Sequence, residues 1–124
     1  MWWNKYIGEE YTEENDCMAL AVRVAKEVLG KDIISPPYQP NIWSQAKAVG
    51  DFKDGVCKRA DTAEDGNPVL FLCRKRFYHI GVLVHTNNEQ YVLHADQQAG
   101  FVLLTRLRDM AEKGYEFEGF YQWI

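Results

Sequence analysis

Several classes of function are disfavoured by what the sequence lacks. It has no long basic segment, and its formal net charge is −4 at pH 7, so nucleic acid is not expected as a partner. No apolar run approaches the length that spans a membrane, so no membrane partner is expected. The first residues contain neither a basic n-region nor an apolar h-region, which argues against a signal peptide. We therefore expect cytoplasmic synthesis, with action outside the cell requiring another carrier or a virion.

The sequence contains few cysteines, and their spacing does not indicate disulfide bonds. The three of them, Cys17, Cys57 and Cys73, are odd in number and far apart, which suits reduced thiols better than a disulfide framework. The sequence has no C-x-x-C motif and no close histidine pair, so we expect no metal site and no cofactor. Repeats are absent too, and 124 residues suffice for one hydrophobic core. A single domain over residues 1–124 is expected.

An amphipathic helix is predicted over residues 15–29. The apolar residues of its buried stripe, three and four positions apart, are Leu20, Ala21, Val24, Ala25 and Val28. Asn15 or Asp16 supplies the N-cap, and Gly30 ends the helix. Cys17 falls in the first turn, where free N–H groups and the helix dipole favour a thiolate. Cys17 is therefore a candidate nucleophile, and the alternative is a small buried hydrophobe.

The remaining elements place helices first and strands afterwards. A second helix is predicted over residues 41–49, capped by Asn41 and ended by Gly50, with Trp43 facing inward. A third, over residues 106–112, would be capped by Thr105. The predicted strands cover residues 56–59, 69–73, 78–85, 90–95, 101–104 and 115–123. This order indicates an α+β fold in which the Cys17 helix packs on an antiparallel sheet of about five strands.

One predicted hairpin supplies a partner for the thiol. Asn87 and Asn88 suit a two-residue turn, because asparagine tolerates positive φ. With that turn, His79 lies opposite Asp96 and diagonal to His94 on one face. A histidine held by a third polar group and presented to a thiol is the arrangement that nucleophilic catalysis requires. His79 is thus the candidate base, with His94 or Asp96 orienting it.

Two further residues belong to this prediction. Gly81 lies opposite His94 in the same register and leaves room for one imidazole to lean toward the other. His85, at the strand end beside the turn, is expected to be a surface residue. A shift of one residue in register would move His94 to the other face of the ribbon.

Four segments in this order resemble the NlpC family of papain-like cysteine peptidases, which are bacterial and phage cell-wall endopeptidases. The segments are KYIGEEYTEENDCMALAVRV, NPVLFL, YHIGVLV and YVLHAD. The resemblance implies a papain-like, NlpC-type fold in which Cys17 is the nucleophile, His79 the general base and acid, and His94 the orienting residue. It also implies that Asp16 contacts the free amine of a peptide substrate and that Tyr11, or else Tyr6, lies near the oxyanion site. The backbone N–H of Cys17 is the implied oxyanion donor.

The implied substrate is a peptide bond in the stem peptides of peptidoglycan. The chain departs from the family pattern in four places. Met18-Ala19 stands where Ser-Gly is common, and residues 65–68 replace a Pro-Gly-Asp. The loop between Tyr11 and Cys17 is shorter and lacks paired glycines, and the hairpin from His79 to His94 is a little longer. Without a wall-binding module, the chain looks more like the phage tail-associated members or like secreted effector amidases. Phage tail proteins are then further expected partners.

Two other functions remain open from the sequence. One is a non-catalytic tail or assembly protein that keeps the fold, with aromatic residues near both termini as its interface. These aromatic residues are Trp2, Trp3, Phe120, Tyr121 and Trp123. The other is a thiol-dependent transferase, which would use the same three residues as the hydrolase.

Overall fold

The computed structural model describes the backbone of residues 1–124 and every side chain except those of Ile42, Phe77 and Tyr78. Its helices are the 3₁₀ helix η1 (Asn4–Tyr6), α1 (Cys17–Leu29), α2 (Ile42–Val56) and the 3₁₀ helix η2 (Leu107–Lys113). Its strands are β1 (Cys57–Arg59), β2 (Pro68–Cys73), β3 (Arg76–Thr86), β4 (Glu89–Asp96), β5 (Phe101–Arg106) and β6 (Glu116–Trp123). The α+β prediction is confirmed, with six strands in the sheet instead of about five.

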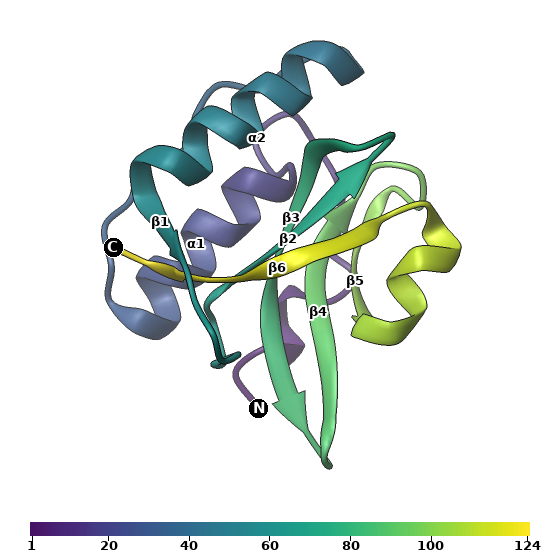
Figure 1. Ribbon diagram of the computed structural model, residues 1–124. Coiled ribbons are helices and arrows are strands. Elements are labelled where there is room, and N and C mark those ends of the chain that lie inside the picture. The colour runs from purple at the N-terminus through teal and green to yellow at the C-terminus, as the bar shows by residue number, and fades with distance from the viewer.

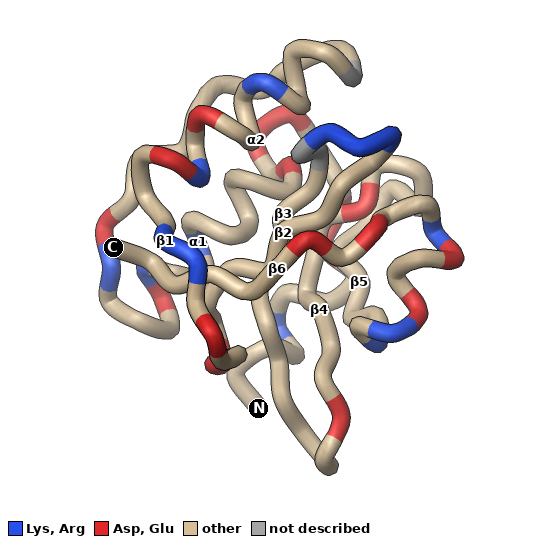
Figure 2. Tube along the Cα trace, viewed as in Figure 1, with Lys and Arg blue, Asp and Glu red and all other residues tan. Residues whose placement is uncertain are grey.

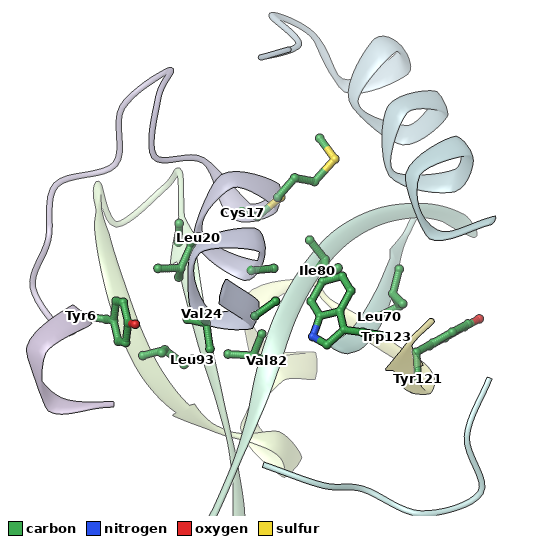
Figure 3. Close-up of a cluster of buried hydrophobic side chains, with 14 of the residues drawn as sticks. Tyr6, Cys17, Leu20, Val24, Leu70, Ile80, Val82, Leu93, Tyr121 and Trp123 are labelled. Carbon is green, nitrogen blue, oxygen red and sulfur yellow. The ribbon is translucent and has the colours of Figure 1, made fainter. Parts of the chain in front are cut away.

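The sheet is antiparallel throughout, in the order β1-β6-β2-β3-β4-β5. Figure 1 shows α1 and α2 together on one side of it and η2 toward the opposite edge. The larger core lies between the helices and the sheet, where Leu20 and Val24 of α1 meet Ile80, Val82 and Leu93 (Figure 3). A smaller core on the other face includes Phe71, Met110 and Tyr115. The Cys17 helix therefore packs on the sheet as predicted.

Helix α1 has the predicted boundaries because both of its ends are capped. Asp16 is the N-cap, and its side chain accepts a hydrogen bond from the backbone N–H of Ala19 at 2.9 Å. Gly30 takes the left-handed conformation, with φ of 70°, and its N–H bonds to the last turn of the helix. The buried stripe is completed by Leu20, Ala21 and Val24, all 1% exposed or less. These features anchor the residue that begins the helix, Cys17.

Helix α2 is longer than predicted. Asn41 caps it as expected, but the helix continues through Gly50 and Gly55 to Val56. Glycine in a helix interior costs only about 1 kcal/mol, which packing of α2 against the sheet outweighs. Trp43 was expected to face inward and is instead 61% exposed. The inward face is formed by Gln45, Val49 and Phe52, one turn apart.

The β3–β4 hairpin has the predicted register. Asn87 and Asn88 form the turn with φ of 53° and 60°, and Thr86 pairs with Glu89. The last Cα pairing of this ladder is Val82 with Leu93. Beyond it, the start of β3 pairs with β2 and the end of β4 pairs with β5. The two histidines lie in this part of the hairpin, next to the first turn of α1.

The end of the chain differs from its prediction in one detail that bears on the site. Thr105 was expected to cap a helix, but it is the fifth residue of β5, and η2 begins only at Leu107. The side chain of Thr105 therefore belongs to the sheet. The terminal aromatics lie mostly in the core, with Trp3, Tyr121 and Trp123 at 9%, 6% and 4% exposure and Trp2 packed against them. None of the helices in the described part of the chain is both long and apolar enough to cross a membrane.

Candidate active site

A small pocket brings the predicted nucleophile and base together. Cys17 enters it from the N-terminus of α1, and His79 enters from β3. The Cys17 thiol also contacts the backbone N–H of Ile80, the residue that follows His79. The residues that line the pocket are Tyr11, Cys17, Gln45, His79, Ala95, Gln97 and Tyr115. Both reactive side chains are enclosed, since Cys17 and His79 are each only 3% exposed.

His94 is the polar group that holds His79. The Nε2 atom of His79 lies 2.8 Å from Nδ1 of His94. The other ring nitrogen of His94, Nε2, lies 3.0 Å from the hydroxyl oxygen of Thr105. The imidazole of His79 therefore has one nitrogen engaged and its Nδ1 on the opposite side of the ring. This line of hydrogen bonds from β3 through β4 to β5 fixes the orientation of the candidate base.

Asp96, the other predicted orienting residue, does not contact His79. Its Oδ1 accepts a hydrogen bond from the hydroxyl of Tyr115 at 3.1 Å and one from the backbone N–H of Gln98 at 3.1 Å. The Nζ atom of Lys113 lies 3.8 Å from its Oδ2. Tyr115 in turn stacks on His79 at 4.2 Å between ring centroids, with 11° between the planes. Asp96 therefore does not hold His79 by a direct hydrogen bond, but it bonds to the hydroxyl of Tyr115, whose ring stacks on His79.

Gln45 is a site residue that the sequence did not reveal. Its Nε2 atom donates a hydrogen bond to Sγ of Cys17 at 3.2 Å. The side chain is 8% exposed, on the face of α2 that otherwise buries Val49 and Phe52. A polar side chain on an apolar helix face is a signal that was present in the sequence, but the helix was predicted with a different face inward.

The thiol and the imidazole are both uncharged in this closed pocket at neutral pH. Burial is the main cause that raises the pKa of Cys17 to about 12, and the negative charge of Asp16 adds to it. Burial, followed by the neighbouring His94, lowers the pKa of His79 well below 6.5. Burial also lowers the pKa of His94 to about 4, against the opposing effect of Asp96. The expected thiolate at the helix terminus is therefore wrong for this state, because desolvation outweighs the helix dipole.

The two predicted substrate-binding residues lie beside the nucleophile. Tyr11 lines the pocket with Cys17. Asp16 is 1% exposed, and its Oδ2 has no hydrogen-bond partner among the described residues. Burial raises the pKa of this carboxyl, although backbone N–H groups of the first turn oppose the shift. Tyr6, the less favoured alternative to Tyr11, is fully buried elsewhere and bonds to Glu27 at 2.5 Å.

The other cysteines and the third histidine lie outside the pocket. Cys57 begins β1 and is 6% exposed, while Cys73 ends β2 and is half-buried. Cys57 is therefore the more buried of these two thiols. His85 is exposed at the end of β3, as predicted. Among the side chains that are described, no group of three histidine, cysteine or acidic residues is placed to hold a metal ion.

Comparison of the chain with protein-family models, with curated proteins and with solved structures gave no match. The geometry of the pocket places a thiol, an oriented imidazole and an amide donor around one small space.

Proposed function

We propose that the protein is a cysteine hydrolase that cuts amide bonds, with Cys17 as nucleophile, His79 as general base and acid, and His94 as the residue that orients His79. One observation carries the proposal: Cys17 shares a pocket with His79, whose Nε2 lies 2.8 Å from His94 Nδ1. A nucleophile, a base and a group that holds the base are the three components of this type of catalysis.

The neutral pair determines how the reaction begins. With the pKa of Cys17 raised to about 12 and that of His79 lowered, a standing thiolate–imidazolium pair is disfavoured. The proton of the thiol therefore moves to Nδ1 of His79 as Sγ attacks the carbonyl carbon of the substrate. The new C–S bond leaves negative charge on the carbonyl oxygen. The backbone N–H of Cys17 and the side-chain amide of Gln45, already 3.2 Å from Sγ, are the donors proposed for that oxyanion.

The second half of the reaction returns the enzyme to its starting state. His79 gives its proton to the leaving amine, the C–N bond breaks, and a thioester on Cys17 remains. Water then attacks the thioester while His79 accepts a proton from it. The acid product leaves as the C–S bond breaks, and the proton returns to sulfur.

His79 can act as a base in only one of the two possible arrangements of hydrogen atoms along the hydrogen bonds from His79 through His94 to Thr105. If His94 donates from Nε2 to the hydroxyl of Thr105, its Nδ1 accepts from Nε2–H of His79. Nδ1 of His79 then carries a lone pair and can accept the thiol proton. The reversed arrangement would leave a proton on Nδ1 and no base. The hydroxyl of Thr105 can accept the hydrogen bond from His94, and Thr105 is proposed to hold the ring of His94 in the position from which it orients His79.

The substrate we propose is a peptide bond in a peptidoglycan stem peptide, in an enzyme of the NlpC type associated with a phage tail. The four ordered sequence segments support it, as do the positions of Tyr11 in the pocket and Asp16 next to the nucleophile. A non-catalytic assembly protein was the alternative, and its proposed interface was aromatic. Trp3, Tyr121 and Trp123 instead pack in the core, so they do not favour that alternative.

The proposal is tested by incubating the protein with purified peptidoglycan fragments and identifying the products by mass spectrometry. Wild type should release fragments cut at an amide bond, and Cys17→Ser should release none. Cys57→Ser is the matched control, because that thiol is also buried and lies on β1, three strands from β3 in the sheet. Absence of product with wild type, or equal product with Cys17→Ser, would overturn the proposal.

A further inference from the structure

A second pocket adjoins the one that holds the nucleophile. It has a volume of about 380 Å³, and it shares two lining residues, Gln97 and Tyr115, with the Cys17 pocket. Its other lining side chains include Cys73 and Arg74 from the β2–β3 turn region, Gln98 after β4, and Lys113 at the end of η2. The two pockets therefore lie side by side, with Gln97 and Tyr115 between them.

The charge of this pocket is positive in a chain that is negative overall. Arg74 and Lys113 line it, and no acidic residue is among its lining residues in the described part of the chain. Lys113 lies 3.8 Å from Asp96, whose side chain is 4% exposed, whereas Arg74 has no ion pair within the described residues. Figure 2 shows the cationic turn between β2 and β3 as a continuous blue segment. The guanidinium of Arg74 is thus available to an anion.

The turn that carries Arg74 has a backbone conformation that is unfavourable for its residues. Arg74 and Lys75 have φ of 55° and 65°, a region that bulky side chains rarely adopt because the Cβ atom crowds the backbone there. The equivalent two-residue turn between β3 and β4 uses Asn87 and Asn88, which tolerate this conformation. The same chain thus places asparagines where only a turn is needed and cations beside the candidate site.

We propose that this pocket binds a carboxylate group of the substrate, so that the hydrolase acts on peptides with a free carboxylate near the scissile bond. The inference rests on the proposed function. A guanidinium presents two parallel N–H donors that match the two oxygens of a carboxylate. Lys113 adds a second cation, and the side-chain amides of Gln97 and Gln98 add neutral donors.

The test uses Cys73, which lines the pocket, to report the electrostatic potential of the pocket. The rates of Cys73 alkylation by anionic iodoacetate and neutral iodoacetamide are measured by peptide mapping, in wild type and in Arg74→Asn. Lys75→Asn is the matched control, because it removes the same charge from the same turn but from a residue that does not line the pocket. Asparagine tolerates the positive φ, so both variants should fold. At an ionic strength of about 0.15 M, where the Debye length is about 8 Å, the iodoacetate-to-iodoacetamide ratio should fall about threefold in Arg74→Asn and by clearly less in Lys75→Asn.

A second arm tests the substrate itself. Peptidoglycan stem peptides with free carboxylates are compared with the same peptides after chemical amidation. Arg74→Asn should raise KM about fivefold for the free acids, with kcat kept, and should leave the amidated peptides unchanged. Three outcomes would overturn the inference while leaving the hydrolase proposal intact. They are an unchanged alkylation ratio at Cys73 in Arg74→Asn, an equal fall of that ratio in Lys75→Asn, and an equal change of KM for the free and the amidated peptides. If wild type cleaves neither peptide, the hydrolase proposal fails and the substrate assignment fails with it.

Discussion

Substituting Gly81 by alanine tests how closely β3 and β4 must approach beside the histidine pair. A Cβ atom at position 81 would lie 2.3 Å from Cγ1 of Val92, 3.1 Å from the carbonyl oxygen of Leu93 and 3.2 Å from Cβ of His94. Val92 is fully buried and branched at Cβ, so it has little freedom to turn away. The strands must therefore move apart by about 1 Å to reach ordinary contact distance.

The expected cost follows from that contact. Overpacking in a core costs about 1–3 kcal/mol, and the reduced entropy of the unfolded alanine chain returns about 0.5–1 kcal/mol. We expect Gly81→Ala to lower the free energy of unfolding by about 1–2 kcal/mol in urea denaturation. Val92→Ala alone should cost about 2 kcal/mol through lost burial.

The double variant distinguishes this explanation from a general loss of stability. Alanine at position 92 has no Cγ1 atom, so the shortest contact disappears, and the double variant should be more stable than the sum of the two single effects by about 1 kcal/mol. Additive effects, or a Gly81→Ala variant as stable as wild type, would refute the argument. The prediction that Gly81 leaves room in the hairpin was made from sequence; the side chain that occupies most of that room is Val92.

Three further predictions concern the site. The pKa values of His79 and His94 are lowered in the folded protein, so the unfolded chain binds more protons below pH 6.5. The free energy of unfolding should therefore fall as the pH drops from 6.5 toward 4, by up to about 1.4 kcal/mol per pH unit for each histidine. Urea denaturation at a series of pH values should show a weaker pH dependence of this free energy in His94→Gln than in wild type. Asp16→Asn keeps the N-cap but removes a charge that raises the pKa of Cys17, so alkylation of Cys17 at pH 8 should become severalfold faster with little change in Tm; an unchanged rate would contradict the role assigned to that charge. Thr105→Val should lower the hydrolytic rate about tenfold or more and Thr105→Ser should not, and equal activity of the two would argue against the positioning of His94 by the hydroxyl.

Local signals in the sequence predicted the elements that hold the site. The N-cap and C-cap of α1 and the two asparagines of the β3–β4 turn are short-range features, and they placed Cys17, His79 and His94 correctly. The turn alone fixes the hairpin register, which decides that both histidines lie on one face.

The remainder of the site depends on packing between distant segments. Gln45 lies 28 residues from Cys17 and Thr105 lies 11 residues from His94, and no periodicity links either pair. The end of α2 was missed because tertiary contacts carry the helix through Gly50. The charge state of Cys17 was missed for the same reason, since burial is a property of the folded protein and outweighs the local effect of the helix terminus.

The most direct measurement of the central claim compares two thiols of the same protein. Burial is the main cause that raises the pKa of both Cys17 and Cys57 to about 12, but only Cys17 shares a pocket with His79. Iodoacetamide alkylation at pH 7.5, resolved by site, should be at least about tenfold faster at Cys17 than at Cys57, because the imidazole accepts the thiol proton. His79→Gln should bring the two rates together. Equal rates in wild type, or a Cys17 rate unaffected by His79→Gln, would contradict the account.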